Sequence, residues 1–193
     1  MNDQPKEIPS VEELKTELKR VRYRRRYNTV LRSTIYILIT VAAAAILVAT
    51  LWLPVLQVYG SSMTPTIGDG QTVLAFKTDR LAQGDVIVMY HNNKILIRRV
   101  IAMPGDWVNI NDNGTVTVNG ILLEEPYVEK PSRGQINIEL PYQVPEGKYF
   151  VMGDNRATSV DSSNTALGCI APDQVLGKVL LRLWPLEELS IIQ

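Results

Sequence analysis

The sequence is poor in the residues that build metal sites and covalent cross-links. Its 193 residues include one cysteine, Cys169, and one histidine, His91. An intrachain disulfide is therefore impossible, and a zinc site made of cysteine and histidine ligands is excluded. Cys169 lies in the apolar segment 167–170, where a cysteine is expected to fill space in a core rather than to react.

Acidic residues are the minority at the start of the chain, and basic residues are the minority in the rest of it. Residues 1–32 carry nine Lys or Arg against five Asp or Glu, whereas the remaining residues carry eleven against fifteen. Because no basic face is left after Arg32, binding of nucleic acid by the body of the protein is not expected. The opposite charge excess of the two parts suggests that they lie in different surroundings.

Segment 35–56 contains no charged residue. As a helix its 22 residues would be about 33 Å long, enough to cross a hydrocarbon core of about 30 Å. Tyr36 and Trp52 lie near its two ends, as aromatic residues of the membrane interface do. The run is longer than the apolar part of a signal peptide, so an uncleaved transmembrane anchor is predicted. The basic cluster 19–26 before it predicts a cytoplasmic N-terminus and an extracytoplasmic remainder.

A short helix is expected before the anchor. Ser10 is followed three residues later by Glu13, the pattern of a capping box, and apolar residues then recur at three- and four-residue spacing. These apolar positions are Val11, Leu14, Leu18 and Val21. The helix would lie against the membrane surface or pair with a partner helix.

After residue 66 the pattern is typical of β-structure. Short apolar runs bounded by Gly and Asp predict strands at 71–76, 86–90, 95–103, 107–110, 115–118, 136–140, 149–152 and 175–183. Two Asn-Gly pairs, at 113–114 and 119–120, predict hairpin turns. Residues 120–147 are richer in proline, glycine and charge, which indicates a loop-rich excursion. No repeat and no second long helix is predicted, so this part is mainly β, as a few sheets or a partly closed barrel.

Three polar stretches stand out, at 60–66, 97–106 and 153–162. Each combines glycine with hydroxyl or charged residues in apolar surroundings, and each taken singly is compatible with a structural turn. Together, in this order and after a single anchor, they resemble the type I bacterial signal peptidases, membrane-bound serine proteases with a Ser/Lys dyad.

The resemblance covers residues 35–184 and implies a fold and an activity. It implies a transmembrane helix followed by a mainly β domain of several antiparallel sheets with a smaller inserted subdomain. We therefore expect a cytoplasmic segment at 1–34, the anchor at 35–56 and an extracytoplasmic domain at 57–193, with a non-catalytic insertion at about 111–147. The implied partners are the signal peptides of exported pre-proteins and the lipid bilayer, and no metal or cofactor is implied.

The resemblance also assigns roles to individual residues. Ser62, directly before Met63, falls at the nucleophile, and the oxyanion hole is expected from its own N–H and the neighbourhood of Gly60 and Ser61. Some members have a second serine at the position of Gly60, whose hydroxyl is missing here. The remaining assignments are Ser159, which would orient the catalytic lysine; Asp161, a supporting carboxylate; and Asp154, Arg156 and Arg99, which would be framework residues.

Arg98 departs from the family pattern, because it occupies the position of the catalytic lysine. A lysine amine can be brought to a neutral state by burial and then accept the proton of the serine. A guanidinium remains protonated and has no acceptor site, so Arg98 cannot act as the base. A further family arginine is replaced by Ser163, so Asp161 needs another cation, for which Arg98 or Arg99 is available.

No other residue is expected to replace the base. In a strand, Lys94 would share the face of Arg98 but lie about 13 Å from it. His91 would be farther away, and both are expected to face solvent. We therefore expect the chain to be inactive or strongly impaired as a peptidase.

Three origins of Arg98 remain open at this point. They are a substitution made to silence the enzyme, a natural homologue that lost proteolysis but kept peptide binding or a role in assembling surface proteins, and slow cleavage with water as the base. Residues 56–62 span at most about 20 Å, which holds Ser62 near the membrane surface, where the cleavage site of a signal peptide also lies. A soluble Ser/Lys autoprotease repressor fits poorly, since it would have no use for the anchor.

Overall fold

The computed structural model describes residues 10–192, which divide into two compact units with the boundary between Ala49 and Thr50. Residues 1–9 of the expected cytoplasmic segment lie outside the described residues. Below, each unit is described by itself.

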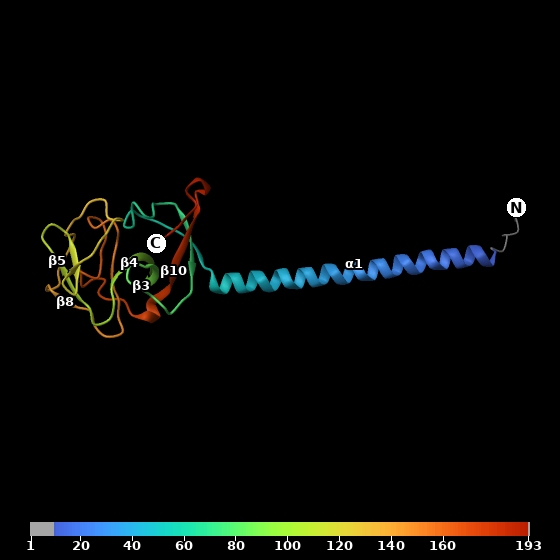
Figure 1. Ribbon diagram of the computed structural model, residues 1–193, viewed down its shortest axis with the longest axis horizontal. Helices are drawn as coiled ribbons and strands as arrows, with labels where there is room; N and C mark the ends of the chain where they lie inside the picture. The colour runs from blue at the N-terminus through green and yellow to red at the C-terminus, as the bar shows by residue number, and fades with distance from the viewer. Residues whose placement is uncertain (1–9, 193) are drawn as a thin grey trace. The chain divides into compact units, whose positions relative to one another are not determined.

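The first unit is made of helix α1, which runs without a break from Val11–Trp52 and so continues into the first residues of the second unit (Figure 1). The predicted capping box is confirmed: the N–H of Ser10 donates to Glu13 Oε2 (2.9 Å), and the N–H of Glu13 donates to Ser10 Oγ (3.3 Å). The expectation of a separate short helix was wrong. No glycine or proline occurs between residues 11 and 52, so nothing breaks the helix between the amphipathic and the apolar segment.

The apolar part of α1 passes the length and hydropathy requirements of a membrane span. The helix ends at Trp52, four residues before the end of the predicted anchor. The reason is Pro54, which has no N–H to donate and disfavours helical dihedral angles in the residue before it. Residues Val55–Gln57 instead form strand β1.

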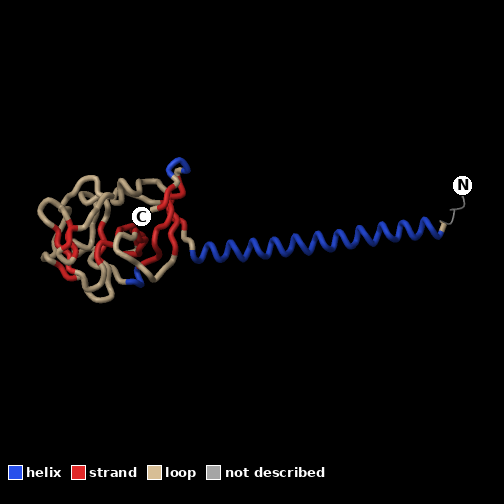
Figure 2. Tube along the Cα trace, viewed as in Figure 1, coloured by secondary structure: helices blue, strands red, loops and turns tan. Residues whose placement is uncertain are grey.

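The second unit contains a seven-stranded antiparallel sheet with the strand order β1-β2-β10-β3-β4-β9, in which β11 pairs with β10. Its strands are β1 (Val55–Gln57), β2 (Thr72–Phe76), β3 (Val86–His91), β4 (Lys94–Ala102), β9 (Phe150–Met152), β10 (Val175–Trp184) and β11 (Ser190–Ile191). Short 3-10 helices, Pro172–Gln174 and Leu186–Glu188, precede β10 and β11 respectively. Figure 2 shows that loops connect most of these strands.

A second antiparallel sheet, with the order β7-β6-β5-β8, has no ladder to the first sheet and shares a hydrophobic core cluster with its strands β4 and β9. Its strands are β5 (Trp107–Ile110), β6 (Val116–Val118), β7 (Ile121–Leu122) and β8 (Tyr142–Gln143). Both predicted Asn-Gly hairpins are confirmed, since β5 pairs with β6 and β6 with β7. This sheet begins at Trp107, before the expected start of the insertion at residue 111. The strand predicted at 136–140 was wrong, because this segment has no strand partner and instead packs Ile136, Ile138 and Leu140 against the core.

Strand β3 shows how the larger sheet is buried on both faces. Val86 and Val88 belong to one core cluster, with Met63 and Ile67, while Ile87 and Met89 belong to another. Successive side chains of a strand point to opposite faces, so the continuous apolar run of β3 fits a strand that is covered on both sides. The predicted mainly β fold of antiparallel sheets after one long apolar helix is confirmed.

Candidate active site

Ser62 lies in the turns that follow β1, and two contacts fix its position. The neighbouring Met63 is 1% exposed and anchors the segment in the core. The carbonyl of Ser62 accepts the N–H of Asn155 at 3.1 Å. Gly153 allows this approach: a Cβ at this position would lie 2.5 Å from the Ser62 carbonyl oxygen. The first and third polar stretches of the sequence therefore meet through their backbones.

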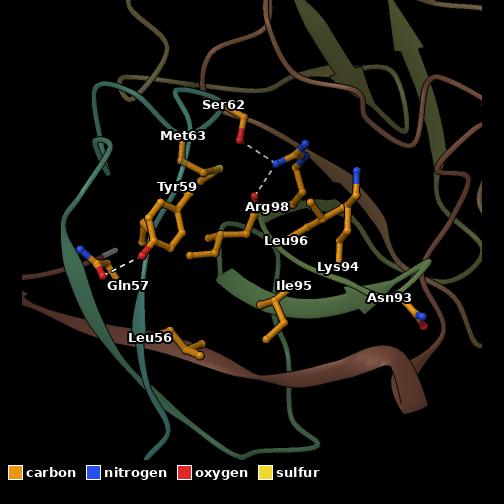
Figure 3. A pocket seen from close by; sticks show the side chains of 12 residues that line it. Leu56, Gln57, Tyr59, Ser62, Met63, Asn93, Lys94, Ile95, Leu96 and Arg98 are labelled. Atoms are coloured by element: carbon orange, nitrogen blue, oxygen red, sulfur yellow. Dashed lines mark hydrogen bonds between the residues drawn. The ribbon is translucent and has the colours of Figure 1, made fainter.

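Arg98 reaches Ser62 from strand β4 (Figure 3). Its Nη1 donates to Ser62 Oγ at 2.8 Å and to the carbonyl of Ile97 at 2.7 Å. Its Nε and Nη2 both donate to the carbonyl of Val160, at 3.2 and 3.1 Å. Arg98 is 5% exposed. The guanidinium is thus held in one position, with Ser62 as an acceptor of its hydrogen bond.

Asp161 supplies the opposite charge. Its Oδ1 lies 3.6 Å from Arg98 Nε and accepts the N–H of Gly153 at 3.1 Å. Of the two cations considered for Asp161, it is therefore Arg98 that pairs with it. The nearby hydroxyl of Ser159 is buried and has no hydrogen bond of normal geometry among the described residues. Burial lowers the pKa of Arg98 and the charge of Asp161 opposes this shift, but a guanidinium stays protonated at physiological pH.

The protonation of Asp161 gives a pH-dependent contribution to stability. Burial raises the pKa of Asp161 above its usual value, and the hydroxyl of Ser159 and the charge of Arg98 oppose this shift. Between the unfolded pKa of about 3.9 and the raised folded pKa, the folded chain binds more protons than the unfolded chain. The contribution of Asp161 to stability therefore rises as the pH falls through this window.

We expect the wild-type chain to gain stability relative to Asp161→Asn as the pH is lowered from 7 to 4, because asparagine does not titrate. Urea unfolding of both chains at several pH values measures this difference. A difference that stays constant, or that changes in the opposite direction, would contradict the assignment of the raised pKa.

Gly60 and Ser61 lie beside Ser62 in the chain but are engaged elsewhere. Gly60 has a φ of +94°, which favours glycine, and its N–H donates to Asp69 Oδ1 at 2.6 Å. Ser61 is exposed, and its carbonyl accepts the hydroxyl of Thr64 at 2.7 Å. The N–H of Gly60 is therefore taken up by a carboxylate and is not free to stabilise an oxyanion.

Arg99 and Asp154 form a second, separate network. Arg99 is 1% exposed, and its Nε and Nη2 donate to the two carboxylate oxygens of Asp154 at 2.9 and 2.8 Å. Asp154 also accepts the hydroxyl of Thr66, and the guanidinium of Arg99 lies 3.8 Å from the ring centre of Tyr127. Adjacent residues of β4 point to opposite faces of the sheet. Arg98 therefore contacts Ser62 on one face, while Arg99 connects β4 to the segment of Asp154 on the other.

Arg156 does not pair with Asp154, although both are buried. Its Nη2 pairs with Glu125, and its Nε donates to the carbonyl of Gly153 at 3.0 Å. Sequence reasoning missed the roles of Glu125, Tyr127 and Val160. Glu125 and Tyr127 lie in the loop-rich segment, where no periodicity marks them, and Val160 acts through its backbone carbonyl, which no side-chain pattern reveals.

A groove of about 580 Å³ opens beside Ser62 and Arg98. Its walls are the segment from β1 to Met63 and the first half of β4 (Figure 3). Most of the lining is apolar or uncharged: Leu56, Gln57, Val58, Tyr59, Met63, Asn93, Ile95, Leu96 and Ile97, with Ser62, Lys94 and Arg98 completing it. The two charged lining residues are both cations.

Three other residues were considered for chemistry in the sequence, namely Lys94, His91 and Cys169, and they lie differently with respect to this groove. Lys94 is exposed, and its side chain points in the same direction from β4 as that of Arg98 in Figure 3. The ring of His91 contacts the carbonyl of Ala166 (3.2 Å) and does not line the groove. Cys169 packs against the core of the second sheet, where burial raises the pKa of its thiol. The predicted structural role of Cys169 fits this position.

The fold and the site define a class: a membrane-anchored serine hydrolase in which the serine meets a basic side chain of a β-strand instead of a histidine. The family described as "Signal peptidase, peptidase S26" matches residues 31–184. The chain belongs to this family, whose members are serine proteases that process signal peptides.

Two curated relatives, at 37% and 40% identity, agree with this assignment. Signal peptidase I of Bacillus licheniformis is 37% identical over 166 residues, which is 79% of this chain and 88% of the relative. Signal peptidase IB of Staphylococcus aureus is 40% identical over 150 residues, or 67% of this chain and 76% of the relative. The crystal structure of a signal peptidase I from Enterococcus faecalis V583 is 29% identical, with a TM-score of 0.44, and covers 51% of this chain and 96% of that chain.

Proposed function

We propose that this chain binds the signal peptides of exported pre-proteins at the membrane surface and does not cleave them at an appreciable rate. The observation that carries the proposal is the hydrogen bond from Arg98 Nη1 to Ser62 Oγ (2.8 Å). In a Ser/Lys dyad the serine proton passes to a neutral amine. Here the group that contacts the serine is a permanent donor, and among residues 10–192 no basic acceptor is hydrogen-bonded to Ser62 Oγ. Ser62 is the proposed nucleophile position, and Arg98 replaces its base.

Peptide binding is supported by two free strand edges beside the groove. Strand β4 pairs with β3 from Lys94 to Arg99 on one side but with β9 only from Arg99 to Ala102 on the other. Among the described residues, the β9 side of β4 therefore has no strand partner from Lys94 to Ile97. Strand β1 pairs with β2 on one side only. An extended peptide can add to such edges through main-chain hydrogen bonds, while its side chains enter an apolar groove.

The end of α1 limits how far the groove lies from the bilayer. We propose that the membrane span extends from about residue 35 to Trp52, where the helix ends. Ser62 lies ten positions after Trp52, a distance of at most about 35 Å when extended. A signal peptide also presents small residues at the end of an apolar segment, so the groove and the substrate lie near the same surface.

We further propose that residues 1–34 are cytoplasmic and that the β domain is extracytoplasmic, because Lys and Arg collect on the cytoplasmic side of membrane spans. Protease added to spheroplasts is expected to digest the domain after residue 57 and to leave an N-terminal tag on residue 1 intact. Digestion of the tag in intact spheroplasts would contradict this orientation, and lysed cells serve as the control in which both parts are digested.

Two measurements test the proposed function. The first is turnover of a synthetic signal peptide by the wild-type chain and by Arg98→Lys. If the wild-type chain cleaves as fast as the variant, cleavage with water as base is the correct interpretation and the proposal is overturned.

The second measurement is binding, by fluorescence anisotropy of a labelled signal peptide. Leu96→Glu places a charge in the apolar groove and is expected to weaken binding at least about 10-fold, as for a central contact residue. Leu122→Glu is the matched control, since Leu122 is 60% exposed on β7, away from the groove. Equal affinity of both variants and the wild type would show that the groove is not the peptide site.

A further inference from the structure

The hydrogen bond between Arg98 and Ser62 reverses the role of the serine hydroxyl. A guanidinium can only donate, so Ser62 Oγ accepts this bond. The O–H of Ser62 has no acceptor among residues 10–192 and remains able to donate. Ser62 is half-buried and lines the groove, so its hydroxyl offers a bound ligand a hydrogen-bond donor.

Arg98 itself retains one N–H without a hydrogen-bond acceptor among the described residues. Its Nε, both N–H groups of Nη1 and one of the two on Nη2 are accounted for by Val160, Ser62 and Ile97. One N–H of Nη2 is left from the five that a guanidinium carries. Arg98 is also fixed in position by these bonds, so a ligand does not need to order it.

The charge of the groove has one sign. Lys94 and Arg98 are the charged residues among its lining, and no Asp or Glu is present there. Asp161 balances part of the charge of Arg98, but it lies on the Nε side and does not line the groove. The exposed amine of Lys94 has no opposing carboxylate in the lining. A bound anion would therefore meet two cations and the hydroxyl of Ser62.

We propose that the groove binds peptides through their free C-terminal carboxylate, which lies against Ser62 and Arg98. This inference rests on the proposed peptide binding and adds the chemical form of the ligand. If the carboxylate belonged to an Asp or Glu side chain of the peptide, that charged side chain would have to enter the apolar part of the groove. A C-terminal carboxylate instead ends the peptide backbone, which would run along the strand edges. Cleavage of a pre-protein by an active peptidase leaves such an end on the signal peptide.

The test compares two peptides that differ only at the C-terminus. The full-length chain in detergent micelles is titrated against a fluorescent eight-residue apolar peptide ending in Ala, as the free acid or as the amide. The free acid is expected to bind at least about 10-fold more tightly, since only the acid makes charge-assisted hydrogen bonds. Acid and amide binding equally would overturn this inference while the proposed peptide binding stands. If neither peptide binds, both are overturned.

Two variants and one control show which residues cause the preference for the free acid over the amide. Ser62→Ala removes the hydroxyl donor and is expected to reduce the ratio of acid to amide affinity about 3-fold. Lys94→Gln removes the charge of an exposed side chain of the groove, and it is expected to reduce the ratio of acid to amide affinity about 3-fold. Arg133→Gln is the control for general charge, because Arg133 is exposed and pairs with Asp112 outside the groove. An unchanged ratio in Ser62→Ala and Lys94→Gln, or a similar reduction in Arg133→Gln, would contradict the proposed contacts.

Discussion

Arg98→Lys is expected to give this chain measurable signal-peptide cleavage, with a rate at least about 100-fold above that of the wild type. A positioned general base contributes roughly 10²- to 10⁴-fold to a rate. The lysine would lie on the same strand, at the same register, in surroundings that bury the side chain almost fully. Burial disfavours the charged amine and so increases the neutral fraction that can accept the Ser62 proton.

The assay is the cleavage of a synthetic peptide that spans a signal-peptide cleavage site, followed by chromatography and mass spectrometry of the products. The double variant Ser62→Ala with Arg98→Lys is expected to be inactive, which excludes a contaminating peptidase. Arg98→Met, which removes the charge without adding a base, is expected to be as inactive as the wild type. Cleavage by Arg98→Met at the rate of Arg98→Lys would show that the lysine does not act as a base.

Asp154→Ala is expected to lower the free energy of unfolding by about 3–5 kcal/mol. The variant leaves Arg99, which is 1% exposed, without the carboxylate that accepts two of its hydrogen bonds. Breaking a buried ion pair by removal of one partner has a cost of this size, because an uncompensated charge stays buried. Thr66 also loses the acceptor of its hydroxyl. The measurement is urea unfolding of the full chain in micelles, monitored by tryptophan fluorescence.

Asp112→Ala is the matched control. Asp112 also pairs with an arginine, Arg133, but their side chains are 92% and 51% exposed. Exposed pairs contribute about 0–1 kcal/mol, so this variant is expected to unfold almost as the wild type does. Equal losses in both variants would contradict the view that Asp154 stabilises the domain by compensating a buried charge.

The two neighbouring arginines of β4 thus serve different purposes. Arg99 is a structural residue, with Asp154, Thr66 and Tyr127 around it. Arg98 lies on the other side of the strand and contacts the group that would be the nucleophile. A cation in either place is compatible with the fold, but only a neutral amine at residue 98 would allow Ser62 to lose its proton.

The sequence by itself determined the apolar helix, most strands and the chemical deficiency of the site. The length of the uncharged segment predicts a membrane span, and apolar runs separated by Asn-Gly pairs predict hairpins. A guanidinium remains protonated in any fold, so the lack of a base at residue 98 can be read from the sequence. The continuity of α1 also follows from the sequence, because no glycine or proline lies between residues 11 and 52. The change from an amphipathic to an apolar pattern does not by itself end a helix, and so the expectation of a separate short helix was wrong.

The tertiary structure decided which groups meet. Contacts such as that between Asp161 and Arg98, or between Gly153 and the backbone of Ser62, join residues far apart in the chain. They depend on the pairing of β3, β4 and β9, which local patterns do not specify. One acceptor of the Arg98 side chain, the Val160 carbonyl, is a backbone group that every residue possesses. Only the position of that group in the folded chain, and not the identity of residue 160, directs the guanidinium onto Ser62.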